Sequence, residues 1–252
     1  MSNIVKISAL GAATLLFVAP FAEFAEVRRS KHVGERSVFP FVCMWCSSTL
    51  WVVYGLFIWD IVPTVATNLV GFLFSMYYCA VFASVVEPAS RKRSTYNLFA
   101  GTFLVVSFVV TFCLGSFSPV LEKTRLRSMS LDTGAGSTEE EGDERAKRFL
   151  GLAASAATAV QYASPLAELV KVFKRRSTEG MSFTLAVVSL VCSSLWMSYG
   201  MMLGNAFIYV PNVMGVLFSI SQCFLFWIFP RKGKGMAVSS KLDRGDPYKG
   251  AV

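Results

Sequence analysis

Seven apolar runs constrain the fold of this chain more than any other feature of its sequence. Each run has about 20 residues, the length at which an α-helix spans the hydrocarbon core of a bilayer. A water-soluble protein cannot bury so many uniformly apolar helices, so the runs predict an all-α integral membrane protein with seven transmembrane helices. The runs are Ile4–Phe24, Phe39–Ile58, Ile61–Val86, Tyr96–Phe117, Phe149–Phe173, Met181–Leu203 and Ala206–Phe229.

The charged residues support this prediction and indicate an orientation. The chain is 54% hydrophobic and 16% charged, with a net charge of +8. Its basic residues follow the first, third, fifth and seventh runs, whereas the links after the second and sixth runs contain no Lys or Arg. Because Lys and Arg accumulate on the cytoplasmic side, we expect the amino terminus outside and the carboxyl terminus in the cytosol. We expect the plasma membrane as the location, and the sequence leaves the choice of membrane open. Nucleic-acid binding is not expected, since soluble segments with interleaved aromatic residues are lacking.

The chain contains an internal repeat. LWVVYG (50–55) returns as LWMSYG (195–200), and in the same register of 145 positions Pro20 matches Pro165. After the loss of one residue, NLVG (68–71) matches NVMG (212–215). Apolar composition alone does not produce paired Trp, Tyr, Asn and Pro, so the pattern predicts a duplicated three-helix unit. Since the first run has a counterpart inside the chain, we expect it to be retained and not cleaved as a signal peptide.

The orientation of the two copies predicts the architecture. Both copies start with a run that leads into a basic link, so both cross the membrane in the same direction. Three spans reverse the direction of the chain, and the unmatched run Tyr96–Phe117 restores it. The expected fold is therefore 3+1+3, with two parallel three-helix repeats around a central pocket.

Four regions follow from this architecture. The first repeat covers 1–90, the linker helix with a long polar outside loop covers 91–148, the second repeat covers 149–230, and a basic cytosolic tail covers 231–252. Residues 118–148 mix acidic, basic and small residues without an apolar period. We expect this loop and the tail to be disordered.

Paired polar and aromatic residues within the runs predict a substrate site. A polar side chain inside a membrane is costly unless it faces a partner or a cavity. A single asparagine commonly bonds a neighbouring helix, but two at matching positions, each followed by a glycine that leaves room, favour a shared pocket. Two matching tryptophans offer flat faces for a sugar ring, and amides both donate and accept hydrogen bonds. The predicted substrate-binding residues are Ser47, Trp51, Asn68, Cys192, Trp196 and Asn212.

The sequence does not indicate catalysis or an energy source. Coupled transporters hold Asp, Glu or His near the centre of the membrane, whereas the only histidine here, His32, lies in a basic link. A nucleotide-binding glycine loop is also lacking. We therefore expect no enzyme activity, metal or cofactor, and we expect facilitated diffusion. Cys43 and Cys46 form a CxxC within an apolar run, where packing is the expected role.

Prolines predict where the helices bend. Pro20, Pro40 and Pro165 fall in the cytosolic third of their runs, and a proline inside a helix removes one hydrogen bond and kinks it. Three prolines in one layer predict a bending plane. Pro211, which precedes Asn212, is expected to break the last helix beside the pocket.

With these residues the chain resembles the SWEET family of sugar transporters. The resemblance rests on YASPLAELVKVFKRRSTEGMSF (162–183), LWMSYG and VPNVMG in the second half, and on LWVVYG and NLVG in the first. It implies a bidirectional sugar uniporter that works by alternating access on mono- or disaccharides. The tryptophans and asparagines above would form its pocket, and Tyr54 and Tyr199 its outer gate.

Two gating positions depart from the pattern of that family. An outer-gate aspartate of the second repeat is replaced by Asn205, whereas Asp60 lies at the outer edge of the first repeat. The fourth proline of the inner layer is replaced by Ser182.

Other classes of protein fit the sequence less well. The related PQ-loop group of proton-coupled amino-acid exporters has a Pro-Gln dipeptide, whereas Pro20 is followed by Phe21 and Pro165 by Leu166. A seven-helix receptor shares the topology but has no reason to duplicate its pocket residues. The expected partners are a small neutral sugar and membrane lipid. The size of the sugar and the formation of a homo-oligomer stay open.

Overall fold

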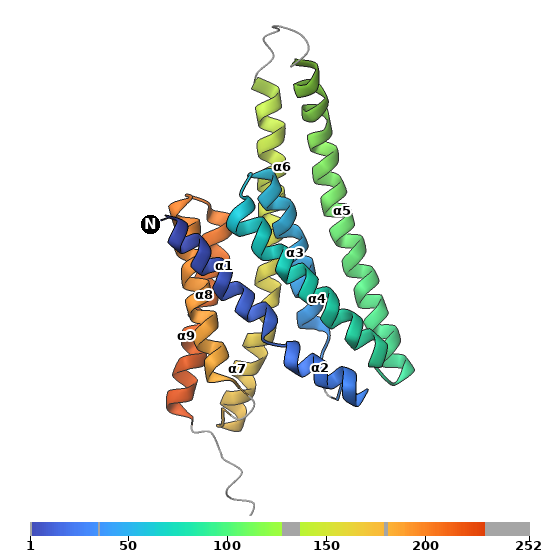
Figure 1. The fold of residues 1–252 in the computed structure, drawn as a ribbon, viewed down its shortest axis with the longest axis vertical. Helices are drawn as coiled ribbons and strands as arrows, with labels where there is room; N and C mark the ends of the chain where they lie inside the picture. Colours follow the sequence, from blue (N-terminus) through green and yellow to red (C-terminus); the bar gives the residue numbers. More distant parts are fainter. Residues whose placement is uncertain (1, 35, 128–136, 179–180, 230–252) are drawn as a thin grey trace, which may run out of the picture.

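The computed structural model describes residues 2–34, 36–127, 137–178 and 181–229, and these form an all-helical bundle without a β-strand (Figure 1). The helical elements are α1 Ser2–Val18, α2 Phe21–Ser30, α3 Phe39–Phe57, the π-helical turn η1 Ile61–Val65, α4 Ala66–Val85, α5 Ala89–Arg127, α6 Ser137–Gln161, α7 Ala163–Arg175, α8 Phe183–Met202 and α9 Ala206–Ile228. The predicted all-α fold is confirmed.

Each predicted apolar run is helical over most of its length. Among the described residues, six helices are long and apolar enough to cross a membrane. The remaining run, 149–173, which is the fifth in chain order, is divided between α6 and α7 at Tyr162. Pro165 accounts for the division, because it lacks the N–H that would bond the carbonyl of Gln161. Pro20 separates α1 from α2 for the same reason.

The helices form two similar units joined by α5. In the first unit α4 contacts both α1 and α3, and in the second α9 contacts both α6 and α8. The units meet through two equivalent interfaces, since α1 packs against α8 and α6 packs against α3. The linker helix α5 packs against α6 and α3 at the side of the bundle (Figure 1). The two interfaces surround the centre of the molecule.

The expectation for residues 118–148 is wrong. Residues 118–127 continue α5, and 137–148 form the first part of α6, whereas we expected a disordered loop over 118–148. Long charged side chains such as Glu, Lys and Arg lose little rotamer freedom in a helix. Two long helices can therefore continue beyond the rest of the bundle (Figure 1). Residues 128–136 and the tail from residue 230 lie outside the described residues.

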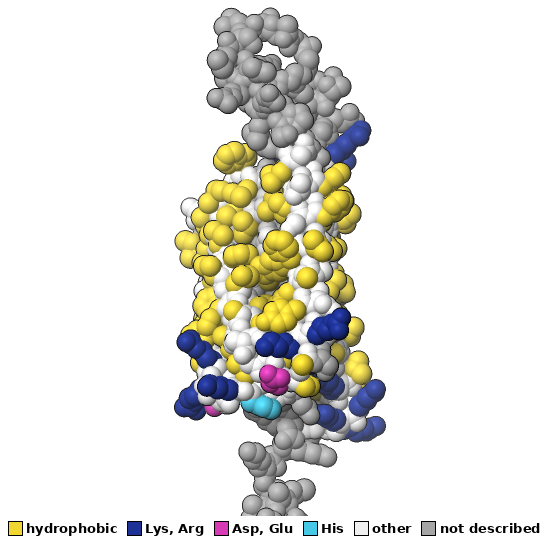
Figure 2. All heavy atoms as spheres, turned by 90° about the vertical axis from the view of Figure 1, so that its right-hand side faces the viewer, with side chains coloured by type: hydrophobic (Ala, Val, Ile, Leu, Met, Phe, Trp, Pro, Cys, Tyr) yellow, Lys and Arg dark blue, Asp and Glu magenta, His cyan; other side chains and the backbone are white. Residues whose placement is uncertain are grey.

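The bundle has two chemically different ends. We call the end where α1 begins the amino-terminal end, and the opposite end, with Arg28, Arg29 and Lys174, the basic end. Figure 2 shows apolar side chains as a band on the face formed by α5, with Lys and Arg gathered below it. At the basic end Arg91 of α5 donates to the carbonyls of Gly34 and Arg36, which ties the α2–α3 link to the linker helix.

The apolar band is largely solvent-accessible in the isolated bundle. The exposed large apolar residues of α5 include Phe103, Leu104, Val105 and Phe108. Exposed apolar surface on this scale is unusual in soluble proteins. None of the six cysteines forms a disulfide, and Cys43 and Cys46 lie on the apolar wall of a crevice between α3, α5 and α6.

Candidate functional site

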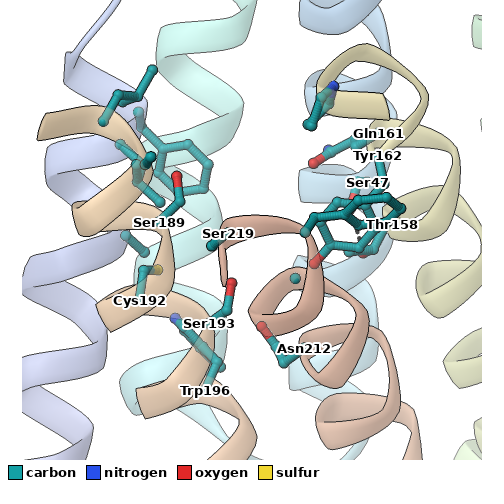
Figure 3. Close-up of a pocket in the computed structure, with 18 of the residues that line it drawn as sticks. Ser47, Thr158, Gln161, Tyr162, Ser189, Cys192, Ser193, Trp196, Asn212 and Ser219 are labelled. Atoms are coloured by element: carbon teal, nitrogen blue, oxygen red, sulfur yellow. Dashed lines mark hydrogen bonds between the residues drawn. The ribbon is translucent and has the colours of Figure 1, made fainter. Parts of the chain in front are cut away.

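A cavity of about 410 Å³ lies between the two repeats (Figure 3). Its walls come from α1, α3 and α4 of the first repeat and from α6, α8 and α9 of the second. It extends toward the basic end, where Pro165, Met181, Ser182 and Gln222 line it. All six predicted substrate-binding residues line this one cavity. In Figure 3, Cys192, Ser193 and Trp196 on α8 face Ser47 and Thr158 across the cavity.

The two tryptophans occupy equivalent positions in the two repeats. Each ring makes an edge-to-face contact with the tyrosine three residues later. The ring centroids are 5.5 Å apart for Trp51 and Tyr54, and 5.9 Å apart for Trp196 and Tyr199. Both tryptophans are mostly buried, and each keeps part of its surface on the cavity.

The two asparagines also have equivalent environments. The Nδ2 of Asn68 donates to the carbonyl of Thr64 at 2.9 Å, and the Nδ2 of Asn212 donates to the carbonyl of Ile208 at 2.7 Å. Each bond goes to the carbonyl four residues earlier in the same continuous span, so neither asparagine bonds a neighbouring span. A carboxamide has two N–H groups and an acceptor oxygen, so each asparagine still has hydrogen-bonding groups for a molecule in the cavity.

The glycines of the two N-x-x-G motifs do not provide space for a ligand. A Cβ on Gly71 would lie 2.6 Å from the Oγ of Ser48, and one on Gly215 would lie 2.5 Å from the Oγ of Ser193. The space beside each glycine is filled by a neighbouring helix. Both glycines therefore allow close helix packing. Gly71 does not line the pocket, contrary to our expectation, whereas Gly215 does line it.

A polar wall on α6 was not predicted. Thr158, Gln161 and Tyr162 line the cavity, and all three bond to the protein. Thr158 accepts from the indole of Trp51 at 2.8 Å, Gln161 donates to the carbonyl of Cys43 at 3.1 Å, and Tyr162 donates to the carbonyl of Pro211 at 3.0 Å. Their spacing, i, i+3 and i+4, places polar groups on one face of an otherwise apolar helix. That spacing was the signal that could have identified them.

The amino-terminal end of the cavity is closed by contacts between the repeats. The Nδ2 of Asn205 donates to the hydroxyl of Tyr54 at 2.8 Å. At the equivalent place in the other half, the Tyr199 hydroxyl is buried near Asp60 without a hydrogen-bond partner, and the Nζ of Lys6 lies 5.8 Å from the Tyr199 ring centroid. Asn205 is thus a neutral donor to Tyr54 at the position that matches Asp60 in the first repeat.

The residues of the predicted bending plane lie at the starts of helices. Pro20 directly precedes α2, Pro40 is the second residue of α3, and Pro165 is the third residue of α7. In the first turn of a helix a proline removes no internal hydrogen bond, so Pro40 marks a helix start. Ser182 is the N-cap of α8, and its hydroxyl accepts from the N–H of Leu185 at 3.3 Å.

Pro211 does not break α9, contrary to our expectation. The helix continues from Ala206 to Ile228 with Pro211 inside it. A proline at this position leaves the carbonyl of Phe207 without its helical donor. Ser155 of α6 supplies a donor instead, since its hydroxyl bonds that carbonyl at 2.8 Å. A hydrogen bond from a neighbouring helix therefore compensates for the proline.

None of the described residues that line the cavity carries a formal charge. The described residues also contain no group of three or more His, Cys, Asp or Glu that could hold a metal. Hydroxyl and amide groups, together with aromatic faces, are the chemistry that the cavity offers. Such a lining suits a neutral molecule with several hydroxyl groups.

Comparisons with known proteins give the same result for both repeats. A sequence profile of the family described as "Sugar efflux transporter for intercellular exchange" matches residues 3–89 and 148–234. The two matched segments are equal in length, and they are offset by the same 145 positions as the internal repeat. Together they cover more than half of the chain.

Individual relatives extend over nearly the whole chain. The chain is 26% identical over 250 residues to the bidirectional sugar transporter SWEET3 of Arabidopsis thaliana, covering 96% of this chain and 86% of the relative. It is 26% identical over 214 residues to the sugar transporter SWEET1 of Danio rerio, covering 85% of both. The fold resembles that in "The 3.7 A resolution structure of a eukaryotic SWEET transporter", with a TM-score of 0.69, 19% identity and coverage of 90% of this chain and 95% of that chain.

Proposed function

The chain belongs to the SWEET family of sugar transporters, and we propose that it is a bidirectional uniporter that moves mono- or disaccharides by alternating access. Such a transporter binds its substrate between two repeats and exposes the site to each side of the membrane in turn. The cavity has this location. It lies between the repeats, and its lining comes from both.

The observation that carries the proposal is the pairing of aromatic and amide groups around an uncharged cavity. Trp51 and Trp196 offer ring faces for the apolar side of a sugar, and Asn68 and Asn212 keep donors and acceptors for its hydroxyls. A neutral substrate needs no counter-charge. This explains why the lining lacks Asp, Glu, Lys and Arg.

The contacts at the two ends support an inward-facing state. The hydrogen bond between Asn205 and Tyr54 closes the amino-terminal end, whereas the cavity continues to Ser182 and Gln222 at the basic end. We place the amino-terminal end outside and the basic end in the cytosol, because positive loops stay on the cytoplasmic side. We propose the plasma membrane as the location, with the exposed apolar faces of α4, α5 and α9 against lipid.

The transition to the outward-facing state requires the repeats to rock about the bound sugar. The Asn205–Tyr54 bond would break, and the helix starts near Pro20, Pro40, Pro165 and Ser182 would approach one another. A uniporter needs no ion for this step, because the sugar gradient alone determines the direction of net flux.

Uptake into vesicles tests the proposal. Labelled glucose and labelled sucrose are offered to vesicles that contain the wild type, Trp196→Ala or Asn212→Ala, with and without a proton gradient. We expect saturable uptake of at least one sugar by the wild type, insensitive to the gradient and reduced by more than about tenfold in both variants. Trp227→Ala is the matched control, because Trp227 is 82% exposed on the lipid side of α9.

The outcomes separate the function from the fold. Wild-type protein that is folded but takes up neither sugar contradicts the proposal. Uptake that needs the proton gradient would contradict the uniport mechanism, while the proposal that the substrate is a sugar would stand. Equal losses in Trp227→Ala and Trp196→Ala would show that the cavity is not the site.

A further inference from the structure

We propose that Thr158 is a positioning residue that fixes Trp51, so that a sugar hydrogen-bonds the indole of Trp196 and only stacks on Trp51. The proposal rests on the function proposed above, because it concerns the same cavity. It divides the roles of two tryptophans that the repeat makes equivalent.

The hydroxyl of Thr158 has no capacity left for a substrate. It accepts from the Nε1–H of Trp51 at 2.8 Å, donates to the carbonyl of Ala154 at 3.1 Å and lies 3.0 Å from the Oγ of Ser47. A hydroxyl has one donor and two acceptor positions. Since its donor is directed to Ala154, the third bond must be donated by Ser47. Thr158 is then saturated, and Trp51 and Ser47 have both given their donors to it.

Trp196 has no such partner. In the repeat register the counterpart of Thr158 is Ala13, whose methyl side chain cannot accept a hydrogen bond. The Nε1–H of Trp196 has no hydrogen bond to any described residue, and it is not among the buried atoms that lack one. The atom is therefore accessible, on a residue that lines the cavity. Figure 3 shows Trp196 on the opposite side of the cavity from Thr158 and Ser47.

The chemical consequence is a one-sided site. On the Trp51 side, a sugar finds an immobilised ring face and a serine that can only accept. On the Trp196 side it finds an indole donor that the protein does not use. Once a bound sugar fills the cavity and displaces water, an indole donor left unused would be costly, so a bond from it to a ligand hydroxyl is favoured. The fixed ring of Trp51 stacks without first losing orientational freedom.

A double-mutant cycle on the KM for uptake of labelled glucose or sucrose tests this division. Thr158→Val removes the hydroxyl and keeps the branched shape, and we expect it to raise the KM about three- to tenfold, the value of one hydrogen bond. Thr158→Ser keeps the hydroxyl and is expected to retain most of the wild-type KM. In the Trp51→Phe background Thr158→Val should have no further effect. With Trp196→Phe the two effects should multiply, because they belong to different interactions.

Three results would overturn the proposal. Equal damage from Thr158→Ser and Thr158→Val would assign the role to packing. Independent effects of Trp51→Phe and Thr158→Val would show that their bond does not matter for binding. A wild-type KM in Trp196→Phe would show that its N–H does not bind the sugar.

A spectroscopic readout keeps the test independent of transport. In protein labelled with ¹⁵N-tryptophan, Trp51→Phe and Trp196→Phe assign two of the five indole signals. We expect the Trp51 indole proton to exchange with water more slowly than that of Trp196, and Thr158→Val to abolish this difference. Glucose or sucrose should shift the Trp196 signal more than the Trp51 signal.

This readout also distinguishes the two proposals. If the wild type transports no sugar while Trp51 is protected by Thr158, the proposed function fails and the positioning role stands. If uptake is normal while Thr158→Val leaves the Trp51 exchange unchanged, the positioning role fails and the function stands. A larger sugar-induced shift at Trp51 than at Trp196 would reverse the proposed division.

Discussion

The helices α1 and α6 begin the two repeats at equivalent positions, yet they are held by different interactions. Helix α6 and the residue that follows it form side-chain hydrogen bonds to α3 and α9 through four polar residues: Ser155, Thr158, Gln161 and Tyr162. The residues of α1 in the same register are all apolar: Leu10, Ala13, Leu16 and Phe17. Helix α1 packs on α8 at the level of its buried residues Ala9 and Ala13.

This difference shows how one duplicated fold can acquire two kinds of interface. Hydrogen bonds are directional, so they hold α6 at one height and rotation relative to its neighbours. Apolar contacts are non-directional and tolerate small shifts. The α3–α6 interface therefore defines the shape of the cavity, and the α1–α8 interface can adjust as the repeats rock.

The largest effect is expected at Gly151 of α6, whose counterpart in α1 is Lys6. A Cβ on Gly151 would lie 2.6 Å from the ring of Phe207 and 2.9 Å from the ring of Tyr54, both at the closed end. Gly151→Ala should therefore destabilise this state by about 1–3 kcal/mol, a typical cost of overpacking. Gly11→Ala on α1 is the matched control, because nothing lies within 4 Å of its Cβ position.

The apparent melting temperature and the rate of sugar uptake measure this effect. Both should fall in Gly151→Ala and stay near wild type in Gly11→Ala. Equal behaviour of the two variants would show that the closed end is not tightly packed around α6.

The second effect concerns the carbonyl of Phe207. Ser155→Ala leaves it without a donor, since Pro211 has no N–H, and should cost about 1–3 kcal/mol. Pro211→Ala restores the helical donor, so Ser155→Ala should cost much less in that background. Thermal unfolding of the two single variants and the double variant gives the coupling. Additive losses would contradict the compensation between Ser155 and Pro211.

The repeat made the paired cavity residues predictable from the sequence. Trp51, Trp196, Asn68 and Asn212 line one cavity because duplication brings matching positions to a shared axis. Their hydrogen bonds were not predictable, because a partner such as Thr158 is set by the rotation of one helix against another. The rotation of one helix against another cannot be inferred from residue propensity and spacing within a single helix.

Three errors arose from reading residue types without their neighbours. Gly71 and Gly215 were interpreted as space for a ligand, but a neighbouring helix fills that space. Residues 118–148 were interpreted as disordered from their charge, although the described parts, 118–127 and 137–148, continue two long helices, in which Glu, Lys and Arg are favourable residues. Pro211 was expected to break α9, and a serine from α6 prevents this.

The third effect comes from Gln161, which bonds the carbonyl of Cys43 at 3.1 Å. Gln161→Leu, which introduces the residue of α1 at the same position, should cost about 1 kcal/mol, the net value of one hydrogen bond. The cost is moderate because the carbonyl of Cys43 lies inside α3 and keeps its helical donor. The reverse change, Leu16→Gln, adds a polar group on an apolar interface. Leu16→Gln should therefore lower the melting temperature more than Gln161→Leu does. A smaller effect of Leu16→Gln would contradict the difference between an apolar interface of α1 and a polar interface of α6.

The smallest effect is expected at the two gate tyrosines. Tyr54 lies beside α6 and accepts the Asn205 bond at 2.8 Å, whereas Tyr199 lies beside Lys6 of α1 and its hydroxyl has no hydrogen-bond partner. Tyr54→Phe should therefore cost up to about 1 kcal/mol, and Tyr199→Phe should leave the melting temperature within error of the wild type. Asn205→Ala should remove the effect of Tyr54→Phe and not change that of Tyr199→Phe. Equal losses in the two tyrosine variants would show that both tyrosines form hydrogen bonds at the closed end. The difference between α1 and α6 would then not extend to the gate tyrosines.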